Sequence, residues 1–214
     1  MCMHFPNTFR AMTRVLGFLL VLGAGASTQA QSLAGVELGA APITLETLPM
    51  KPIAREGRGA TKTSKFKLRN GNELSATYDS KANTIRYIEL DWNLAPQATD
   101  TGVASLVFGR TTLNDIRRRN GSNGFSWQRV AMQRDGQQLI AFNAYEVRDK
   151  PGAIVVFVTL ISIPEYEASP LGSDRLGSLA RLRAIILASE AYLDEIWGED
   201  KIYDGSSKSI AWPK

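Results

Sequence analysis

The stretch FGRTTLNDIRRRNGSNGFSW, residues 108–127, is the part of the sequence from which the predicted fold follows. Thr112 and Asp115 are spaced as a helix cap, in which the threonine side chain and an acidic residue satisfy the first backbone N–H groups. Leu113 and Ile116 lie three residues apart, as on one face of a helix. Glycines follow the basic run, and an aromatic segment begins at Gly124. The stretch therefore predicts a short capped helix followed by a strand.

Two further strands are predicted after this one. The first strand covers 124–133, and Asp135-Gly136 after it is a typical hairpin turn. The second strand covers 138–147. A turn with Pro and Gly separates it from a third strand over 153–162, which is apolar on both sides and is predicted to be central. Residues 105–163 thus form a helix followed by three antiparallel strands.

An earlier part of the chain follows the same plan. Thr44-Leu45 opens a short helical segment, and three alternating strands are predicted between Lys65 and Trp92, with Asn70-Gly71 as the first hairpin turn. Gly71 and Gly136 lie in corresponding hairpin turns. The shift in residue number that aligns these two turns also aligns the strands that follow them. Chance similarity between two hairpins is the alternative. We predict an α+β fold built of two repeated helix-plus-three-strand antiparallel meander units.

A long C-terminal helix is predicted to complete the fold. The sequence SDRLGSLARLRAIILASEAYLDEIWG has Ser173 as a plausible N-cap, apolar residues at three- and four-residue spacing, and Gly198 as its end. We expect this helix, 174–197, to pack on the sheet and cover the second face of the strand 153–162. The predicted organisation is a signal peptide (1–30), a first unit with linker (31–104), a second unit (105–163), and a C-terminal helix and tail (164–214).

The repeated plan resembles the architecture of the β-lactamase-inhibitory-protein family, and a single unit resembles the small lipoprotein of the outer-membrane assembly machine. The residues that carry the resemblance are Leu38-Gly39 with Thr44-Leu45, Phe108-Gly109 with Thr112-Leu113, and the two hairpins. The resemblance implies binding to other proteins through a sheet face or loops. The anchoring cysteine of the lipoprotein and the cysteines of the inhibitor are missing here. The resemblance is one of architecture and provides no functional motif that could be transferred to this sequence.

Residues 1–30 have the pattern of an export signal. Arg10 and Arg14 precede the apolar run VLGFLLVLGA, and small residues then favour cleavage after Ala30, with Ala26 as the alternative site. The apolar run is too short for a typical membrane-spanning helix, which needs about 20 residues, although retention as an anchor is the other interpretation. We expect an exported protein, periplasmic or secreted, with no transmembrane segment in the mature chain.

Removal of residues 1–30 would leave a chain without Cys2 and His4, the only cysteine and histidine. This excludes disulfides, thiolate or imidazole metal ligands, and Ser-His-Asp or Cys-His catalysis in the mature chain. We therefore predict no cofactor and favour a non-enzymatic protein. Of the 25 basic residues two would be lost and of the 21 acidic ones none, which leaves a net charge of +2 and gives no indication of nucleic-acid binding.

The candidate binding surface has two parts. Tyr87, Glu89 and Asp91 alternate on one strand face, and Asp79 is expected nearby on the adjacent strand. A carboxylate trio of Asp79, Glu89 and Asp91 could bind a hard cation such as Ca²⁺ or act as acid and base in glycoside cleavage. The alternative is pairing with nearby lysines and arginines, or plain solvation.

The second part is the run of Arg117, Arg118 and Arg119 at the end of the predicted helix. These residues could bind an acidic partner, a phosphate or a lipid head group. Favourable placement at the negative end of the helix dipole is the alternative. Residues 50–64 are predicted to form a loop or an irregular helix. The basic segment 51–67 could likewise touch anionic envelope lipids or polymers, and a solvated loop is the alternative.

Together these features predict an exported binding or assembly protein of the cell envelope that contacts another protein by its sheet face or loops. The alternatives are a carboxylate-based envelope hydrolase and a lipid- or polymer-binding module.

Overall fold

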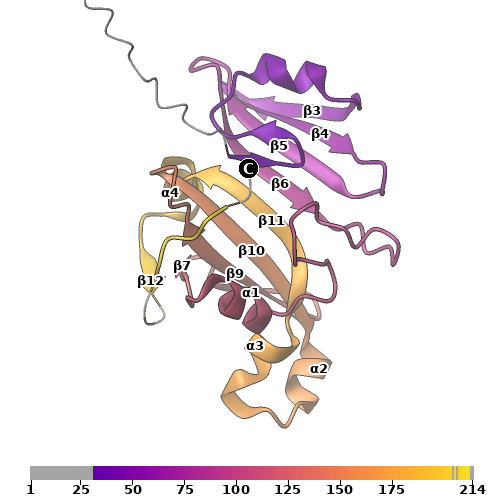
Figure 1. Ribbon diagram of the computed structural model, residues 1–214, viewed down its shortest axis with the longest axis vertical. Coiled ribbons are helices and arrows are strands. Elements are labelled where there is room, and N and C mark those ends of the chain that lie inside the picture. Colours follow the sequence, from indigo (N-terminus) through magenta and orange to yellow (C-terminus); the bar gives the residue numbers. More distant parts are fainter. Residues whose placement is uncertain (1–30, 204, 206, 213–214) are drawn as a thin grey trace, which may run out of the picture.

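A computed structural model describes residues 31–203, 205 and 207–212. The described part contains a ten-stranded antiparallel sheet in the order β12-β7-β9-β10-β11-β6-β5-β4-β3, with β8 paired to β9 (Figure 1). A separate pair, β1 (Ser32–Leu33) and β2 (Val36–Glu37), precedes it. One large antiparallel sheet with a few short helices is compatible with the predicted α+β class.

The first half of the sheet follows a short 3₁₀ helix. The elements are η1 (Pro42–Thr47), β3 (Pro52–Arg58), β4 (Thr61–Lys67), β5 (Glu73–Asp79) and β6 (Thr84–Asp91). The strands predicted between Lys65 and Trp92 are present. The interpretation of 50–64 as a loop or irregular helix is wrong, because β3 and most of β4 form a hairpin there. Most β3 side chains are exposed, so this edge strand has no apolar alternation to reveal it.

The second half begins with helix α1 (Leu113–Asn120), which has the predicted capping box of Thr112 and Asp115 and ends at Gly121 in the left-handed conformation. The predicted strand 124–133 is divided into β7 (Phe125–Trp127) and β8 (Met132–Asp135), both of which pair with β9 (Gln138–Glu146). Strand β10 (Ala153–Ser162) is central, as predicted, and pairs with β9 and β11.

The predicted long helix 174–197 is wrong. Its middle is strand β11 (Arg181–Ser189), which lies between β10 and β6. Short helical segments surround it: α2 (Ile163–Ala168), η2 (Gly172–Asp174), α3 (Arg175–Leu179) and α4 (Glu190–Trp197), and β12 (Lys201–Tyr203) follows. Apart from Arg183, the run from Leu182 to Ala188 is apolar on both faces, a pattern that a buried strand and a buried helix share. Backbone hydrogen bonds to two neighbouring strands favour the strand.

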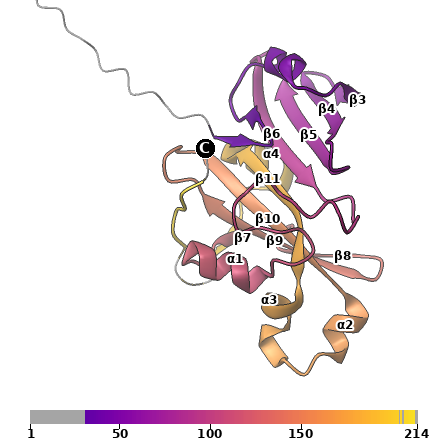
Figure 2. The same cartoon turned by 45° about the vertical axis from the view of Figure 1, so that its right-hand side comes forward.

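Two hydrophobic cores lie on opposite faces of the sheet. Helix α1 lies over the front face of the sheet (Figure 2). The front core on this face includes Ile88, Phe157, Ile185 and Leu187. Trp212 also belongs to it, and its indole N–H donates to the Ser32 carbonyl over 3.0 Å.

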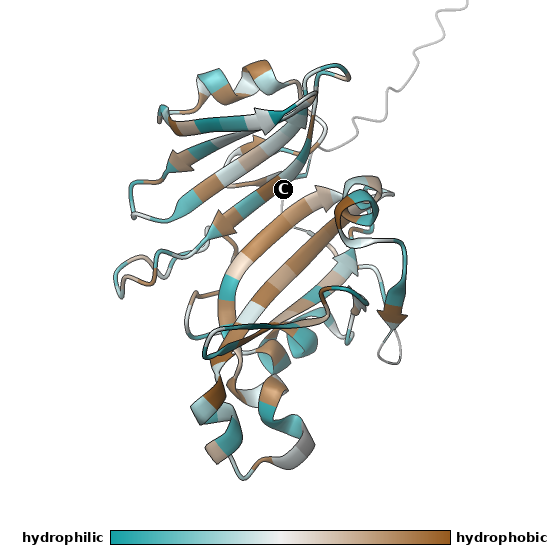
Figure 3. Ribbon diagram, turned by 180° about the vertical axis from the view of Figure 1, so that it is seen from behind, coloured by the Kyte–Doolittle hydropathy of each residue, from teal (hydrophilic) through white to brown (hydrophobic). Residues whose placement is uncertain are grey.

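The rear core packs beneath α4, which contributes Leu193, and includes Trp127, Val156 and Ile186. Hydrophobic residues are concentrated on the central strands in the view from behind (Figure 3). The second face of β10 is therefore covered in part by α4 instead of a long helix. Among the described helices, none has the length and apolar character needed to span a membrane.

The position of β11 predicts which residues of 181–197 matter for stability. Ile185 is fully buried on β11, whereas Ile196 on α4 is 41% exposed. We expect Ile185→Ala to lower the free energy of unfolding by about 2–5 kcal/mol, and Ile196→Ala by less than about 0.5 kcal/mol. Urea denaturation of the two variants measures this. Equal effects of the two substitutions would contradict the assignment of β11 as a central strand.

Candidate functional site

The candidate site lies on the rear face of β6, next to the junction with β11. Tyr87, Glu89 and Asp91 point to this face, since alternate residues of the strand, Ile88 and Leu90, are buried in the front core. We call this surface the seam face; it consists of Tyr87, Glu89 and Asp91 from β6, Glu73, Ser75 and Thr77 opposite them on β5, and Arg183 from β11.

The two sides of the seam face differ in chemistry. On the β5 side, Glu73 pairs with Asp91, and Ser75 pairs with Glu89. On the β11 side the partners are apolar: Ala184 opposite Asp91, Ile186 opposite Glu89 and Ala188 opposite Tyr87. The polar residues of β6 are consequently half-buried at the margin of the rear core.

Helix α4 borders the seam face. Its Tyr192 packs edge-on against Tyr87, with ring centroids 5.8 Å apart. The Arg86 guanidinium lies 4.7 Å from the centre of the Tyr192 ring and forms an ion pair of 2.6 Å with Glu195. These contacts fix one end of α4 against β6 and shield Tyr87 from water.

The half-buried carboxylates have perturbed acidities. Burial raises the pKa of Glu89 to about 7, and the neighbouring Asp91 charge adds to this, while the hydrogen bond from the Tyr87 hydroxyl (2.8 Å) opposes it. Burial also raises the pKa of Asp91, against the attraction of Arg183. Glu89 is therefore only partly ionised at neutral pH.

Arg183 reaches this region because of a β-bulge. The register between β10 and β11 passes from Thr159–Leu182 to Val158–Ala184, so Arg183 is an extra residue without a partner on β10. Its charge lowers the pKa of both Glu89 and Asp91. Bulges commonly redirect a side chain toward a functional site.

Asp79 is not part of the seam face, and the predicted trio of Asp79, Glu89 and Asp91 is wrong. Asp79 pairs with Thr84 at the opposite end of the β5–β6 hairpin from Asp91. Its carboxylate accepts the backbone N–H groups of Lys81 (2.8 Å) and Ala82 (3.0 Å), which hold its pKa below the usual value. Asp79 therefore stabilises a turn.

Glu73 takes the position that was predicted for Asp79. Counting residues outward from the turn at 80–83 in regular antiparallel register places Glu73 opposite Leu90, and a register shift between Thr77 and Tyr78 moves it opposite Asp91, so the sequence indicates its position to within one residue. Arg183 had no such signal, because the residues around it were assigned to a helix.

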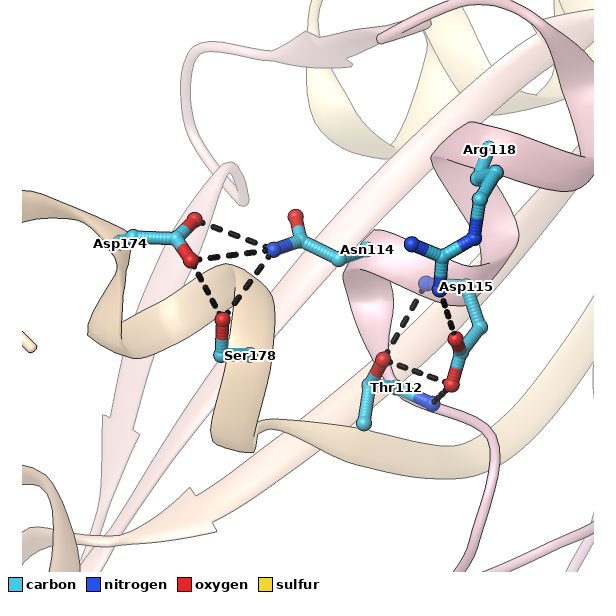
Figure 4. Close-up of polar contacts among 6 residues, drawn as sticks. All are labelled: Thr112, Asn114, Asp115, Arg118, Asp174 and Ser178. Atoms are coloured by element: carbon cyan, nitrogen blue, oxygen red, sulfur yellow. Dashed lines mark hydrogen bonds and ion pairs between the residues drawn. The ribbon is translucent and has the colours of Figure 1, made fainter.

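The three arginines of α1 have different surroundings, and Figure 4 shows Arg118 beside Asp115. Arg118 forms an ion pair with Asp115, the residue of the capping box. Arg119 lines a cavity of about 290 Å³ with Arg148, and burial lowers its pKa. Arg117 lies near enough to Asp174 to lower the pKa of that carboxyl.

The same helix is joined to α3 by polar contacts. The Asn114 amide donates to the Asp174 carboxylate over 3.0 Å and to the Ser178 hydroxyl over 3.2 Å (Figure 4). Gly177 allows this approach, because a Cβ there would lie 2.3 Å from the Asn114 amide oxygen. This region therefore has a structural role at the base of β11.

Within the described ranges, no group of three or more His, Cys, Asp or Glu residues is placed to hold a metal ion. The carboxylates of the seam face, Glu73, Glu89 and Asp91, thus provide negative charge and hydrogen-bond acceptors, but they are not arranged as the ligands of a metal ion.

No protein-family model and no curated protein matches the chain. Among solved structures, the chain is similar to an extracellular protein containing a SCP domain from Bacillus anthracis strain Ames, with 8% identity and a TM-score of 0.47. The match covers 80% of this chain and 50% of that one, so the chain spans about half the length of that protein. A likeness at this level supports no conclusion about function.

The raised pKa of Glu89 predicts a pH dependence of stability. In the folded state the Glu89 carboxyl keeps its proton up to about pH 7, whereas the pKa of this carboxyl in the unfolded chain is about 4.5. The folded state therefore binds more protons between these values, and the contribution of Glu89 to stability is lost as pH rises from 4.5 to 7. Glu89→Gln should remove this loss, which is of order 3 kcal/mol, because the two pKa values differ by roughly 2.5 and each tenfold change in acidity corresponds to about 1.4 kcal/mol.

Urea denaturation of the native protein and Glu89→Gln at several pH values between 4 and 8 measures this effect. The difference between the two curves isolates Glu89 from the other carboxylates. A difference that does not vary with pH would show that Glu89 is not desolvated in the folded protein.

Proposed function

We propose that this protein is an exported, non-enzymatic binding or assembly protein of the cell envelope that contacts a partner protein through the seam face. The observation that carries the proposal is the half-buried pair of carboxylates, Glu89 and Asp91, whose pKa values are raised by burial. Desolvated acids cost folding free energy, and such groups are concentrated at functional sites.

The charges of the seam face indicate what the partner supplies. Three carboxylates, on Glu73, Glu89 and Asp91, face the cations of Arg183 and Lys65, and Lys67 lies opposite Glu73 on β4. Lys65 already forms an ion pair of 2.9 Å with Glu56. A basic side chain or N–H donor of a partner would therefore compensate the excess negative charge and favour the ionised form of Glu89.

Export to the periplasm or the exterior is part of the same proposal. It rests on the signal-like residues 1–30, which lie outside the described part of the chain, and on a mature sequence without cysteine. The absence of cysteine leaves the fold independent of the redox state of the compartment.

We also retain as a proposal that the two halves are repeated units of the kind seen in the β-lactamase-inhibitory-protein family. Each half is a short helical segment followed by an antiparallel meander, and the last strands of the two meanders, β6 and β11, pair with each other. The units would comprise β3–β6 in the first half and β7–β11 in the second, which is more than the three strands predicted for each.

A carboxylate-based hydrolase is the second candidate, and the pKa of about 7 for Glu89 favours it specifically. A carboxyl group with this pKa is suited to act as a general acid near neutral pH. Without Asp79, the possible second carboxylates near Glu89 on the described strands are Asp91 and Glu73.

The double variant Glu89→Gln/Asp91→Asn tests the protein-binding proposal. Cross-linked capture from envelope extract, read by mass spectrometry, should recover a partner with the native protein, and the yield should fall at least tenfold with the variant, because the charges that recognise the partner are gone. Asp135→Asn/Glu167→Gln, which removes two exposed carboxylates elsewhere, is the matched control and should leave capture unchanged.

A partner captured equally by both double variants would contradict the role of the seam face. Binding to anionic lipid vesicles that weakens with salt would instead favour the lipid- or polymer-binding alternative through β3 and β4. Turnover of an envelope glycan that is lost in Glu89→Gln would favour the hydrolase.

A further inference from the structure

A second candidate site lies next to the seam face, at the point where β6 ends and β11 begins. The N–H of Trp92 donates to the Arg183 carbonyl (3.1 Å), and the N–H of Gly109 donates to the Leu182 carbonyl (2.9 Å), so the chain leaves β6 and returns beside β11. Between these segments, the end of β10 and helices α2 and α3 is a cavity of about 280 Å³. We call it the Trp92 pocket.

Trp92 provides an aromatic wall of this pocket. Its ring is parallel to Phe108 within 6°, with centroids 6.5 Å apart. Gly109 makes room for it, since a Cβ there would lie 2.4 Å from the Trp92 ring. The indole N–H donates to the Ala95 carbonyl over 3.1 Å. The ring is thus fixed in place, and its only polar atom is already satisfied.

Arg183 contributes a donor without an acceptor. It lines the Trp92 pocket, and its Nη1 atom is buried and has no hydrogen-bond partner among the described residues. A buried donor without a partner is costly, and native proteins rarely keep one without a reason. The bulge in β11 places this guanidinium between the pocket and the carboxylates of the seam face.

Other polar groups line the same cavity. Gln138 and Glu165 are exposed at its rim, and Arg181 lies at the start of β11. The lining therefore combines a flat aromatic ring with an amide, a carboxylate and guanidinium groups. These groups can donate to and accept from hydroxyls at several angles.

We propose that the Trp92 pocket binds a single neutral sugar residue. A sugar ring offers a C–H face to an aromatic ring and hydroxyl oxygens to a donor such as Nη1 of Arg183. A free anion fits less well, because the two cations of the lining, Arg181 and Arg183, are offset by three carboxylates, Glu165 in the lining and Glu89 and Asp91 beside Arg183. The volume lies near the lower end of ligand pockets, about 300 Å³, which suits one ring.

Saturation-transfer NMR with the full chain tests this proposal, using glucose, galactose, mannose, N-acetylglucosamine and glucuronate as separate probes at millimolar concentration. We expect transfer to at least one neutral sugar, and its loss, by tenfold or more, in Trp92→Ala and in Arg183→Met. Arg134→Met, an exposed arginine on β8, is the matched control and should behave as the native protein.

Two further variants test the proposal if Trp92→Ala does not fold and separate the sugar site from the seam face. If Trp92→Ala fails to fold, Gln138→Ala, at an exposed position of the lining, should still weaken transfer severalfold. Glu89→Gln should leave sugar binding intact, so that failure of the sugar site and failure of the seam face are distinguishable. Transfer to none of the neutral sugars, transfer to glucuronate alone, or transfer that persists in Arg183→Met and Gln138→Ala would overturn the proposal.

Discussion

The structure depends on the pairing of β6 with β11. Five residue pairs, from Tyr87–Ala188 to Asp91–Ala184, join the two halves into one sheet. Without this ladder, the last strand of each half would expose a long edge of unpaired backbone groups, which proteins avoid. The pairing also places β10 and β11 at the centre of the sheet, where both faces can be buried.

The same pairing explains the chemistry of the candidate site. On an isolated first half, Glu89 and Asp91 would face water. Next to Ile186 and Ala184 they stand at the margin of an apolar core, so their ionised forms lose hydration. The bulge at Arg183 supplies a cation that compensates part of this loss, and it leaves one donor atom directed to no acceptor in the described chain.

Local patterns in the sequence were sufficient for part of this picture. The alternation of residues 73–79 and 84–91 and the capping box of Thr112 and Asp115 depend on neighbours in sequence, and the structure confirms them. The presence of Tyr87, Glu89 and Asp91 on one face follows from the two-residue period of a strand.

Features set by distant partners could not be predicted in this way. The run 182–188, apolar apart from Arg183, has a spacing that fits both a helix and a strand, and it forms a strand because it pairs with β10 and β6. Strand β3 depends on backbone pairing with β4, which leaves no trace in its exposed side chains. Arg183 enters the site through a bulge, which is an irregularity of register between β10 and β11.

The most direct test of this account is an NMR measurement of the β6–β11 junction. The structure predicts strand-type Cα chemical shifts for residues 181–189 and cross-strand NOEs between 184–188 and 87–91, including those from Leu187 to Ile88. Helical shifts that continue from 174 through 197, without NOEs to β6, would contradict the account and separate the two halves of the sheet.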